Sequence, residues 1–557
     1  MPSAGALGEP TRDISTAVGE QPPVVQGLAD SGAQATAETA FERSMAEAWR
    51  SAGVEIAPLA DDGEFYRRVA LDLTGSVPSA EQAARFIDDA SADKREVLVD
   101  ELLASEDYAR YWAEVYADLL LGQPTPQTKK TRAGMIAWLA ESFAQGRSYD
   151  AMVSDLLTAS GEFPGGQEAS YLLVRGRQKQ VEALAGATAR IFLGVQIECA
   201  QCHDHPYYDQ YKQQDFYRFA AYFSRTKIRR GKKNKSKNKN KNKMNKSAPV
   251  LVTIKDRRRG ELRIPLADGS PGEVASPRFL GRDVQALDGE SRRQTLARAI
   301  RESDLLAKTV VNRTWATMLG RGLLDPWDDL VAEHDPRHPE TLNILAQDFV
   351  KSGYDHRALL RQISLSQAYQ RSAVGADDSG KAARVFARAA VRPLDAYQLF
   401  SSLAVATGLV ESEKPAYRRR VEERRERALG EYLFVFADDE MGEADVFAGN
   451  VPQALLLLNG DLSNAGVRVR AGGTVQKATA AAKQGGAAAA VETLYLAAYG
   501  RRPGAEELQA TFALLEAHRG PGGPGAGKAG KTGKYTNKAY EDLFYALLLS
   551  SEFVTNH

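Results

Sequence analysis

The 557-residue chain has two cysteines, and both lie in one short motif, Cys199-Ala200-Gln201-Cys202-His203. A C-x-x-C-H run is the attachment pattern of a c-type haem, in which both thiols bind the porphyrin and the histidine binds the iron. Because no other cysteine occurs, the motif is harder to attribute to chance than it would be in a cysteine-rich protein. The fold has to bring two thiols and an imidazole together on one turn.

Other uses of these residues remain open. A redox dithiol of the thioredoxin kind needs a βαβ setting, whereas the preceding stretch, Val181 to Gly194, has the pattern of a helix. Zinc is an alternative cofactor, since thiolates and imidazoles suit a tetrahedral site that would also include His205. Residues two positions apart, as His203 and His205 are, usually point in different directions. An inert pair of thiols or a local disulfide is the third alternative.

Composition sets limits on the partners. Hydrophobic residues make up 43% and charged residues 26% of the chain, which is typical of a globular protein. The formal net charge is zero, which gives no argument for binding nucleic acid or membranes. No stretch reaches the roughly 20 apolar residues that span a bilayer. We therefore expect no nucleic-acid partner and no transmembrane segment.

Residues 1–40 are rich in Ala, Gly, Ser, Pro and Thr and predict a disordered N-terminal segment. They contain neither a basic region nor an apolar region of the kind that forms a secretory signal peptide, so none is visible.

Apolar periodicity predicts a mainly α-helical fold. Ser105 is a candidate N-cap for a helix whose Tyr108, Trp112 and Tyr116 share one face, and this spacing favours core packing over a cofactor wall. A second helix should end before Gly75, and a third should end at Gly320. An aromatic cluster after the cysteine motif fits a helical core and a porphyrin wall equally well; its members are Phe216, Tyr217, Phe219, Tyr222 and Phe223.

The chain divides into two helical domains with a small β-hairpin near their junction. The first domain covers residues 41–228, and the second covers 291–557 and contains a mobile Gly/Lys/Pro-rich loop at 519–534. Residues 229–249 form a Lys/Asn-rich insertion that should be disordered. The span 229–246 holds ten basic residues and no acid, and without it the chain has 62 basic and 72 acidic residues.

Residues 250–290 are predicted to form the hairpin and a connector. Two short strands, Val250 to Ile254 and Glu261 to Pro265, should pair around the charged turn at 256–260.

Ordered motifs in both domains give the chain a family resemblance. It resembles the planctomycete cytochrome-like family, in which a PSCyt-type N-terminal domain precedes a PSD-type C-terminal domain, both of unknown function. The resemblance rests on residues 65–69, 71–75, 192–194 and 199–206 in the first domain, and on 277–281, 311–315, 320–323, 338–340, 452–455, 458–459 and 550–553 in the second.

The resemblance implies a periplasmic or other cell-envelope protein with haem c on Cys199 and Cys202. His203 would bind the iron, and His205 would support the site from nearby or serve as a zinc ligand. The implied function is redox chemistry or electron transfer with an unknown partner. The chain departs from the family in showing no export signal and in carrying the Lys/Asn insertion.

Two alternative functions come from other classes of protein. The first is a non-enzymatic envelope protein whose cysteine motif holds a structural metal or a disulfide. The second is a hydrolase that uses acidic residues of the second domain, although a solvated loop is the default interpretation of that cluster. The cluster comprises Asp325, Asp328, Asp329, Glu333 and Asp335. The nearby His334 and His338 could reach a haem iron, but a structural role is the expectation for both.

Overall fold

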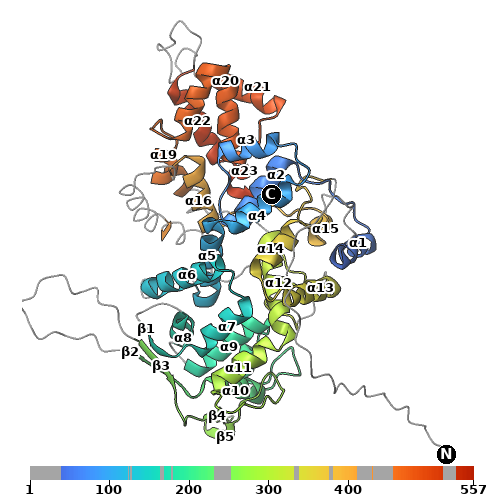
Figure 1. The fold of residues 1–557 in the computed structure, drawn as a ribbon, viewed down its shortest axis with the longest axis vertical. Coiled ribbons are helices and arrows are strands. Elements are labelled where there is room, and N and C mark those ends of the chain that lie inside the picture. Colours follow the sequence, from blue (N-terminus) through green and yellow to red (C-terminus); the bar gives the residue numbers. More distant parts are fainter. Residues whose placement is uncertain are drawn as a thin grey trace, which may run out of the picture. The chain divides into compact units, whose positions relative to one another are not determined.

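Helices make up most of the chain that the computed structural model describes (Figure 1), and the predicted mainly α-helical class is confirmed. The described residues are 39–122, 125, 128–163, 168–176, 180–230, 252–266, 268–331, 338–375, 380–409, 429–430, 456–517 and 535–557. Residues 40–557 belong to one unit. The predicted N-terminal segment, Lys/Asn insertion and Gly/Lys/Pro-rich loop lie almost entirely outside the described residues, so the predictions for them stay predictions.

The first half of the unit is a series of helices joined by short connections. They are α1 (Ala40–Ala52), α2 (Asp62–Thr74), α3 (Ala80–Asp88), α4 (Lys94–Ala104), α5 (Glu106–Leu121), α6 (Lys129–Ala144), α7 (Tyr149–Thr158), α8 (Ala169–Arg175), α9 (Gln180–Leu193), the 3-10 helix η1 (Glu198–Gln201), α10 (Gln213–Ala220) and η2 (Ala221–Phe223).

The second half is helical as well. It contains α11 (Arg292–Arg301), α12 (Asp304–Leu319), α13 (Pro339–Lys351), α14 (His356–Ser364), α15 (Lys381–Arg384), α16 (Ala396–Ala406), α19 (Asp461–Gly466), α20 (Thr474–Tyr499), α21 (Ala505–Ala517), α22 (Asn537–Leu548) and α23 (Ser551–Val554). No helix in the described ranges is both long and apolar enough to cross a membrane.

The predicted helix ends are confirmed. The Ser105 side chain caps α5 by accepting a hydrogen bond from the backbone N–H of Tyr108 at 3.2 Å. Helix α2 ends at Gly75 and α12 ends at Gly320, with φ values of 71° and 85°. A glycine is needed at Gly75 for a second reason, because a Cβ there would lie 2.3 Å from the Tyr111 ring.

Three small antiparallel sheets lie within the described residues. The largest has the order β1-β3-β2, from β1 (Gly161–Phe163), β2 (Thr226–Arg230) and β3 (Val252–Asp256). Strands β4 (Leu262–Pro265) and β5 (Pro271–Ala275) form the small hairpin near the junction, and β6 (Arg392–Pro393) pairs with β7 (Thr555–Asn556).

The predicted strand pairing around residues 256–260 is wrong. Strand β3 pairs with β2, with Ile254 opposite Ile228, while β4 pairs with β5. The reason is side-chain alternation: Val252 and Ile254 face the core, so β3 gains more from joining the core-facing Ile228 than from folding back on β4. Residues 231–251 therefore connect the two strands of a hairpin.

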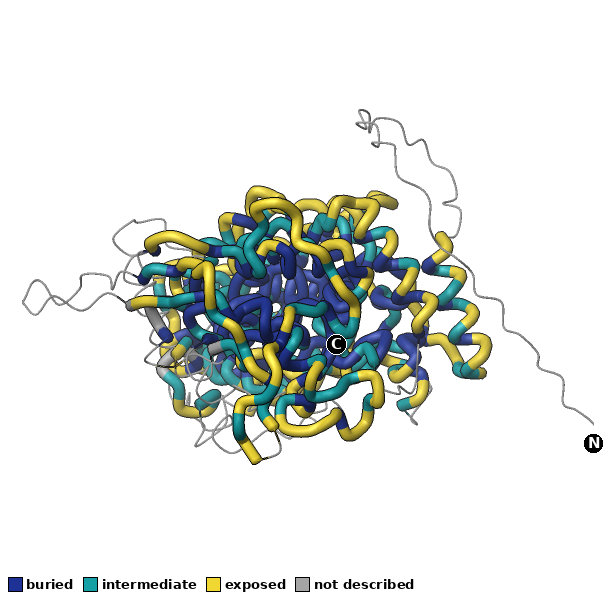
Figure 2. The backbone as a smooth tube through the Cα atoms, turned by 90° about the horizontal axis from the view of Figure 1, so that it is seen from below, coloured by how far each residue is buried: buried dark blue, intermediate teal, exposed yellow. Residues whose placement is uncertain are grey.

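Two hydrophobic cores hold the unit together, and the buried backbone fills its interior (Figure 2). The larger core joins helices α1–α10 to α11–α14, on both sides of the predicted domain boundary. The smaller core joins α16 to α20–α23 and takes in Leu71 and Val77 from the first half. Each core thus contains residues from both predicted domains.

The aromatic stripe on α5 packs in the larger core, as predicted. Tyr108, Trp112 and Tyr116 surround the buried His356, and the Trp112 and His356 ring centroids are 4.7 Å apart. The aromatic cluster after the cysteine motif lies in the same core. Of its two interpretations, the structure supports core packing.

Candidate cysteine-motif site

The cysteine motif forms a short turn with a buried base and exposed thiols. Ile197 and Ala200 are 2% and 0% exposed, and they fix η1 against the larger core. Cys199 and Cys202 are both exposed and carry free thiols. In a 3-10 turn the side chains at positions i and i+3 line up, which puts the two sulfurs on the same edge.

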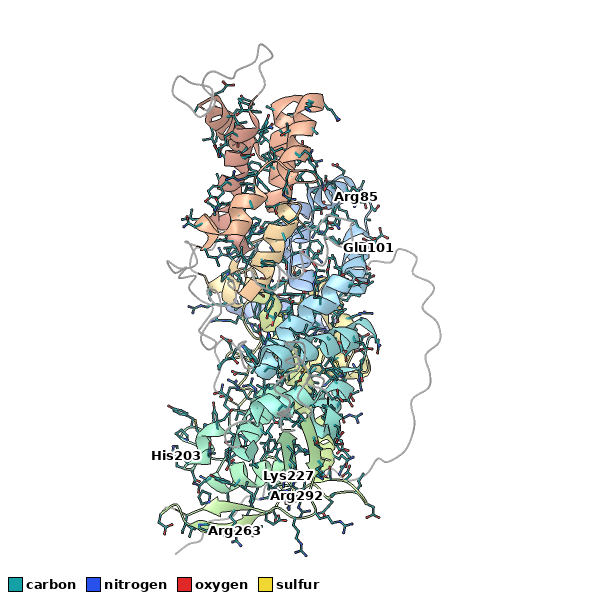
Figure 3. All side chains as sticks on the ribbon, turned by 90° about the vertical axis from the view of Figure 1, so that its left-hand side faces the viewer. Arg85, Glu101, His203, Lys227, Arg263 and Arg292 are labelled. Carbon is teal, nitrogen blue, oxygen red and sulfur yellow. The ribbon has the colours of Figure 1, made fainter. Side chains whose placement is uncertain are left out.

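The His203 imidazole is exposed and has a defined tautomer. Its Nδ1 lies 2.7 Å from the backbone oxygen of Asp204. A carbonyl oxygen only accepts, so Nδ1 carries the proton and Nε2 keeps its lone pair. Histidine ligands usually donate their second ring nitrogen in this way. Figure 3 shows His203 at the surface of the unit.

His205 holds the loop that follows the motif. It is 7% exposed and therefore buried. Its Nε2 donates to the backbone oxygen of Gln196 at 3.1 Å, and its Nδ1 accepts from the backbone N–H groups of Tyr207 and Tyr208. The Tyr208 ring stacks on the imidazole at 4.4 Å. Both ring nitrogens are engaged within the loop, and the predicted roles of His205, support of the site or a zinc ligand, stay predictions.

A loop of the second half that contains Asp328 and Asp329 forms hydrogen bonds with residues on either side of the cysteine motif. Asp328 and Asp329 are 3% and 5% exposed, so the expectation of a solvated loop is wrong for both. The Tyr208 hydroxyl donates to Asp329 Oδ2 at 2.5 Å, and Gln196 Nε2 donates to Asp328 Oδ1 at 3.1 Å. These two contacts tie the motif to residues more than a hundred positions away. Glu333, His334 and Asp335 lie outside the described residues.

Burial changes the acid strength of the groups behind the motif. Desolvation raises the pKa of Asp328, and the Arg190 guanidinium, 3.9 Å away, opposes that rise. Burial also raises the pKa of Glu198, which directly precedes the motif. The Arg313 guanidinium is buried nearby, where it donates to the Ile191 backbone oxygen at 2.6 Å. Asp328 and Arg313 thus lie inside the protein, where they support the loop, whereas Glu198 lies at the surface.

The motif residues fit the covalent attachment of haem c. Two free thiols share one edge, and the adjacent imidazole has its Nε2 available. The aromatic cluster that could have formed a porphyrin wall is 0% to 7% exposed and belongs to the core. For zinc, no group of three or more His, Cys, Asp or Glu side chains in the described ranges comes together to hold an ion.

A second polar junction, which the sequence analysis did not identify as a site, lies at the C-terminal end of the chain. Arg67 donates from Nη1 to the backbone oxygen of Ala498 at 2.9 Å and from Nη2 to that of Phe553 at 2.9 Å. The neighbouring Arg68 donates to the backbone oxygens of Tyr369 and His557 at 2.7 and 3.0 Å. Two adjacent arginines within a buried helix were the available signal.

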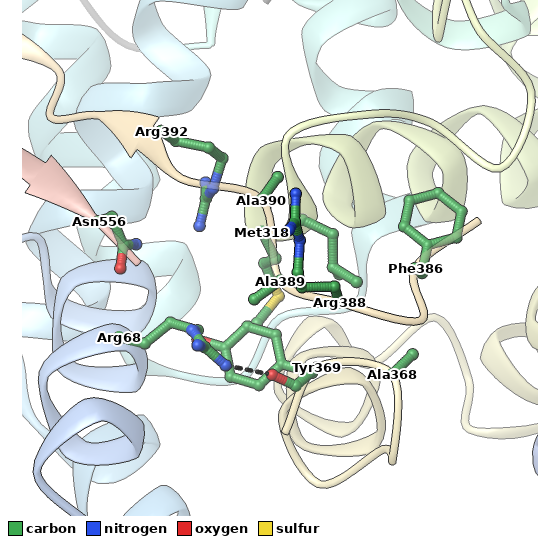
Figure 4. A pocket seen from close by; sticks show the side chains of 11 residues that line it. Arg68, Met318, Ala368, Tyr369, Phe386, Arg388, Ala389, Ala390, Arg392 and Asn556 are labelled. Carbon is green, nitrogen blue, oxygen red and sulfur yellow. Dashed lines mark hydrogen bonds between the residues drawn. The ribbon is translucent and has the colours of Figure 1, made fainter. Parts of the chain in front are cut away.

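Asp72 is the acidic centre of this junction. Both of its oxygens lie 3.0 Å from Arg392 Nη2, the Tyr369 hydroxyl donates to it at 2.7 Å, and Asn556 Nδ2 donates at 2.8 Å. Burial raises the pKa of Asp72, and Arg392 opposes the rise. Figure 4 shows a pocket beside this network, lined by Arg68, Arg392 and Asn556 among others.

The fold and the site together define a mainly helical protein in which the two halves of the unit share their cores and are joined by polar contacts, among them the C-terminal junction and the contacts around the cysteine motif. Residues 40–228 match the family model PSCyt2, a protein of unknown function (DUF1549), and residues 292–515 match PSD1, a protein of unknown function (DUF1553). The chain belongs to the family that joins these two regions, which confirms the resemblance. No curated protein and no solved structure matches the chain.

Proposed function

We propose that this chain is a c-type haem protein that transfers electrons in the cell envelope. Cys199 and Cys202 would bind the porphyrin through thioether bonds, and His203 Nε2 would bind the iron. The observation that carries the proposal is the exposed motif itself, in which two unpaired thiols are followed directly by an exposed imidazole whose Nδ1 already donates to a carbonyl. When bound, the haem supplies one-electron redox chemistry.

The protein's own residues would prepare this attachment. Ile197 and Ala200 hold the turn against the core, so the sulfurs keep their common edge. The Asp204 carbonyl fixes the tautomer of His203. His205 accepts a hydrogen bond from the backbone of Tyr208, and the Tyr208 hydroxyl ties the following loop to Asp329. An exposed motif leaves one edge of the site open to a redox partner, whose identity is unknown.

The proposal is tested by producing the full chain, exported behind a signal peptide, in cells that contain the haem c maturation machinery. We expect a Soret band that persists after acid–acetone extraction and a pyridine haemochrome of the two-thioether type. Cys199→Ser and Cys202→Ser should each shift that haemochrome to the one-thioether type, and the double variant should lose the colour. Ser224→Ala, which alters a buried hydroxyl elsewhere, is the control and should keep the spectrum.

Three results would overturn the proposal. Exported protein could be colourless with both thiols reactive towards a thiol reagent. It could contain one zinc per chain that is lost in Cys199→Ser, which would favour the structural-metal alternative. It could instead show no reactive thiol until it is reduced, which would favour a local disulfide.

A further inference from the structure

The outward face of the β1-β3-β2 sheet is basic. Along β3, Val252 and Ile254 point to the core, so Thr253 and Lys255 lie on the opposite face. Lys227 on β2 stands directly opposite Lys255, and Arg229 stands opposite Thr253. Like charges in directly opposed positions destabilise a strand pair. The sheet therefore keeps an arrangement that works against its own stability.

The basic charge continues beyond the strand. Arg257, Arg258 and Arg259 follow β3 directly, and all three are exposed. We call the six residues Lys227, Arg229, Lys255, Arg257, Arg258 and Arg259 the basic face. Glu162 on β1, opposite Thr253, is the acid that the strand register places on this side of the sheet.

Arginines elsewhere around the same sheet are paired, unlike those of the basic face. Arg293 forms a two-point contact with Asp256 at 2.9 and 3.0 Å, and Arg225 and Arg292 share Glu261 at 2.7 and 2.6 Å. Within the part of the chain that the structure describes, no carboxylate forms an ion pair with any of the six residues of the basic face. The paired arginines hold the sheet on the helices, whereas among the described residues no such pairing occurs for the six.

The segment between β2 and β3 contains further basic residues. Residues 231–251, which join β2 to β3, contain eight lysines and no acid, so they supply no partner for the basic face. The rest of the chain is mildly acidic, with 62 basic and 72 acidic residues outside 229–246. Basic charge is thus concentrated at this edge while the rest of the sequence is mildly acidic, an asymmetry that orients a protein on a charged surface.

We propose that the basic face docks on an anionic lipid bilayer. Lysines and arginines next to a membrane are attracted by acidic headgroups without needing a shaped pocket. The face contains no aromatic side chain on which bases could stack, which disfavours single-stranded nucleic acid. The neighbouring β4–β5 hairpin exposes Leu266 and Val274, at 55% and 42%, and apolar side chains beside basic ones are typical of surfaces that lie in a membrane interface. Figure 3 shows Lys227 and Arg263 of these two sheets at the same end of the unit.

The test is co-sedimentation of the full chain with vesicles that contain either phosphatidylglycerol and phosphatidylcholine or phosphatidylcholine alone. We expect binding only to the acidic vesicles, and it should weaken steeply as salt rises. The triple variant Lys227→Gln, Arg229→Gln, Lys255→Gln should bind roughly 100-fold more weakly, at about fivefold per basic residue removed. The control Arg50→Gln, Arg468→Gln, Lys483→Gln removes the same charge elsewhere and should bind like the wild type.

A stability measurement separates lost binding from misfolding. Because Lys227 and Lys255 repel each other, the triple variant should keep or raise the melting temperature while its vesicle binding falls. The proposal fails if the triple variant binds like the wild type or if neutral vesicles bind equally well. Soluble heparin or duplex DNA can be added as a competitor. The proposal also fails if either one displaces the protein from vesicles when its total negative charge is lower than that of the acidic lipid. The ligand of the basic face would then be a soluble polyanion. The proposal does not depend on the haem.

Discussion

The C-terminal junction and the cysteine-motif junction both include residues of the family motifs, but they differ in what they leave exposed. At the C-terminal junction, formed by Arg67, Arg68 and Asp72 with Arg392 and residues 552–557, the charged groups are paired or donate to backbone oxygens. At the cysteine-motif junction, formed by residues 196–208 with Asp328 and Asp329, the base is buried while both thiols and His203 face solvent.

This difference is the one expected between a structural junction and a site with the chemical role that we propose for the cysteine motif. A buried ion pair is costly to disturb, because removing one partner leaves the other charge buried without compensation. An exposed turn that is held against the core by its buried residues keeps its reactive atoms in place and accessible. Burial thus distinguishes the two motifs: one has its charged groups inside the protein, and the other presents its thiols and His203 to solvent.

The largest effect is expected for Asp72→Ala. The substitution leaves Arg392 buried without its carboxylate, and the loss of one partner of a buried pair typically costs 3–5 kcal/mol, so we expect about 4 kcal/mol. Urea unfolding followed by circular dichroism measures it. Asp304→Asn, which alters an exposed pair with Lys308, is the control and should change stability by less than about 0.5 kcal/mol.

The structural role of the C-terminal junction would be contradicted if Asp72→Ala lowered the free energy of unfolding by less than about 1 kcal/mol. The Asp72–Arg392 pair would then contribute no more to stability than an exposed ion pair does, despite its burial. A second outcome of interest is the state of the cysteine motif in the folded fraction of this variant. If the C-terminal junction is structural, thiol reactivity per folded molecule should equal that of the wild type.

The sequence predicted local features better than the junctions. The caps at Ser105, Gly75 and Gly320 follow from residues within a few positions of one another, and they were predicted correctly. The turn of the cysteine motif also follows from its spacing. The partners of Arg67 lie 431 to 488 positions away, and Asp329 lies 121 positions from Tyr208. No local pattern encodes such contacts, so the sequence could not distinguish a buried acidic loop from a solvated one.

The strand pairing failed for a related reason. The sequence offered β3 and β4 as neighbours because a short charged turn joins them. The true partner, β2, lies across the longer connection of residues 231–251, and the choice between partners depends on which strands have apolar side chains that reach the same core.

Acid should weaken the C-terminal junction through His557. Burial, followed by the nearby charge of Arg67, lowers the pKa of His557 from 6.5 to about 4. The unfolded chain therefore binds a proton at a higher pH than the folded chain. The stability that depends on the neutral ring is complete above pH 6.5 and is lost as pH falls from 6.5 towards 4.

We expect this group to account for about 2 kcal/mol over that window, because the side chain is partly exposed and the full shift has to be discounted for screening. The measurement is the free energy of unfolding of the wild type and of His557→Gln between pH 7.5 and about 4. Their difference should shrink steadily as the pH falls. A difference that is independent of pH would show that the ring at this junction is solvated. Since the buried His356 is present in both proteins, its own acid sensitivity cancels.

The smallest effect on global stability, and the sharpest for the site, is expected for Tyr208→Phe. The variant removes the 2.5 Å hydrogen bond to Asp329 Oδ2 and leaves a buried carboxylate short of one donor, which should cost about 1–2 kcal/mol. Loosening the loop should raise the rate at which Cys199 and Cys202 react with a thiol reagent severalfold. The adjacent Tyr207 is 83% exposed, so Tyr207→Phe is the matched control and should change neither quantity. Equal reaction rates in both variants would mean that the turn keeps its thiols in place without the acidic loop. The geometry of the cysteine motif would then depend on the first half of the unit alone.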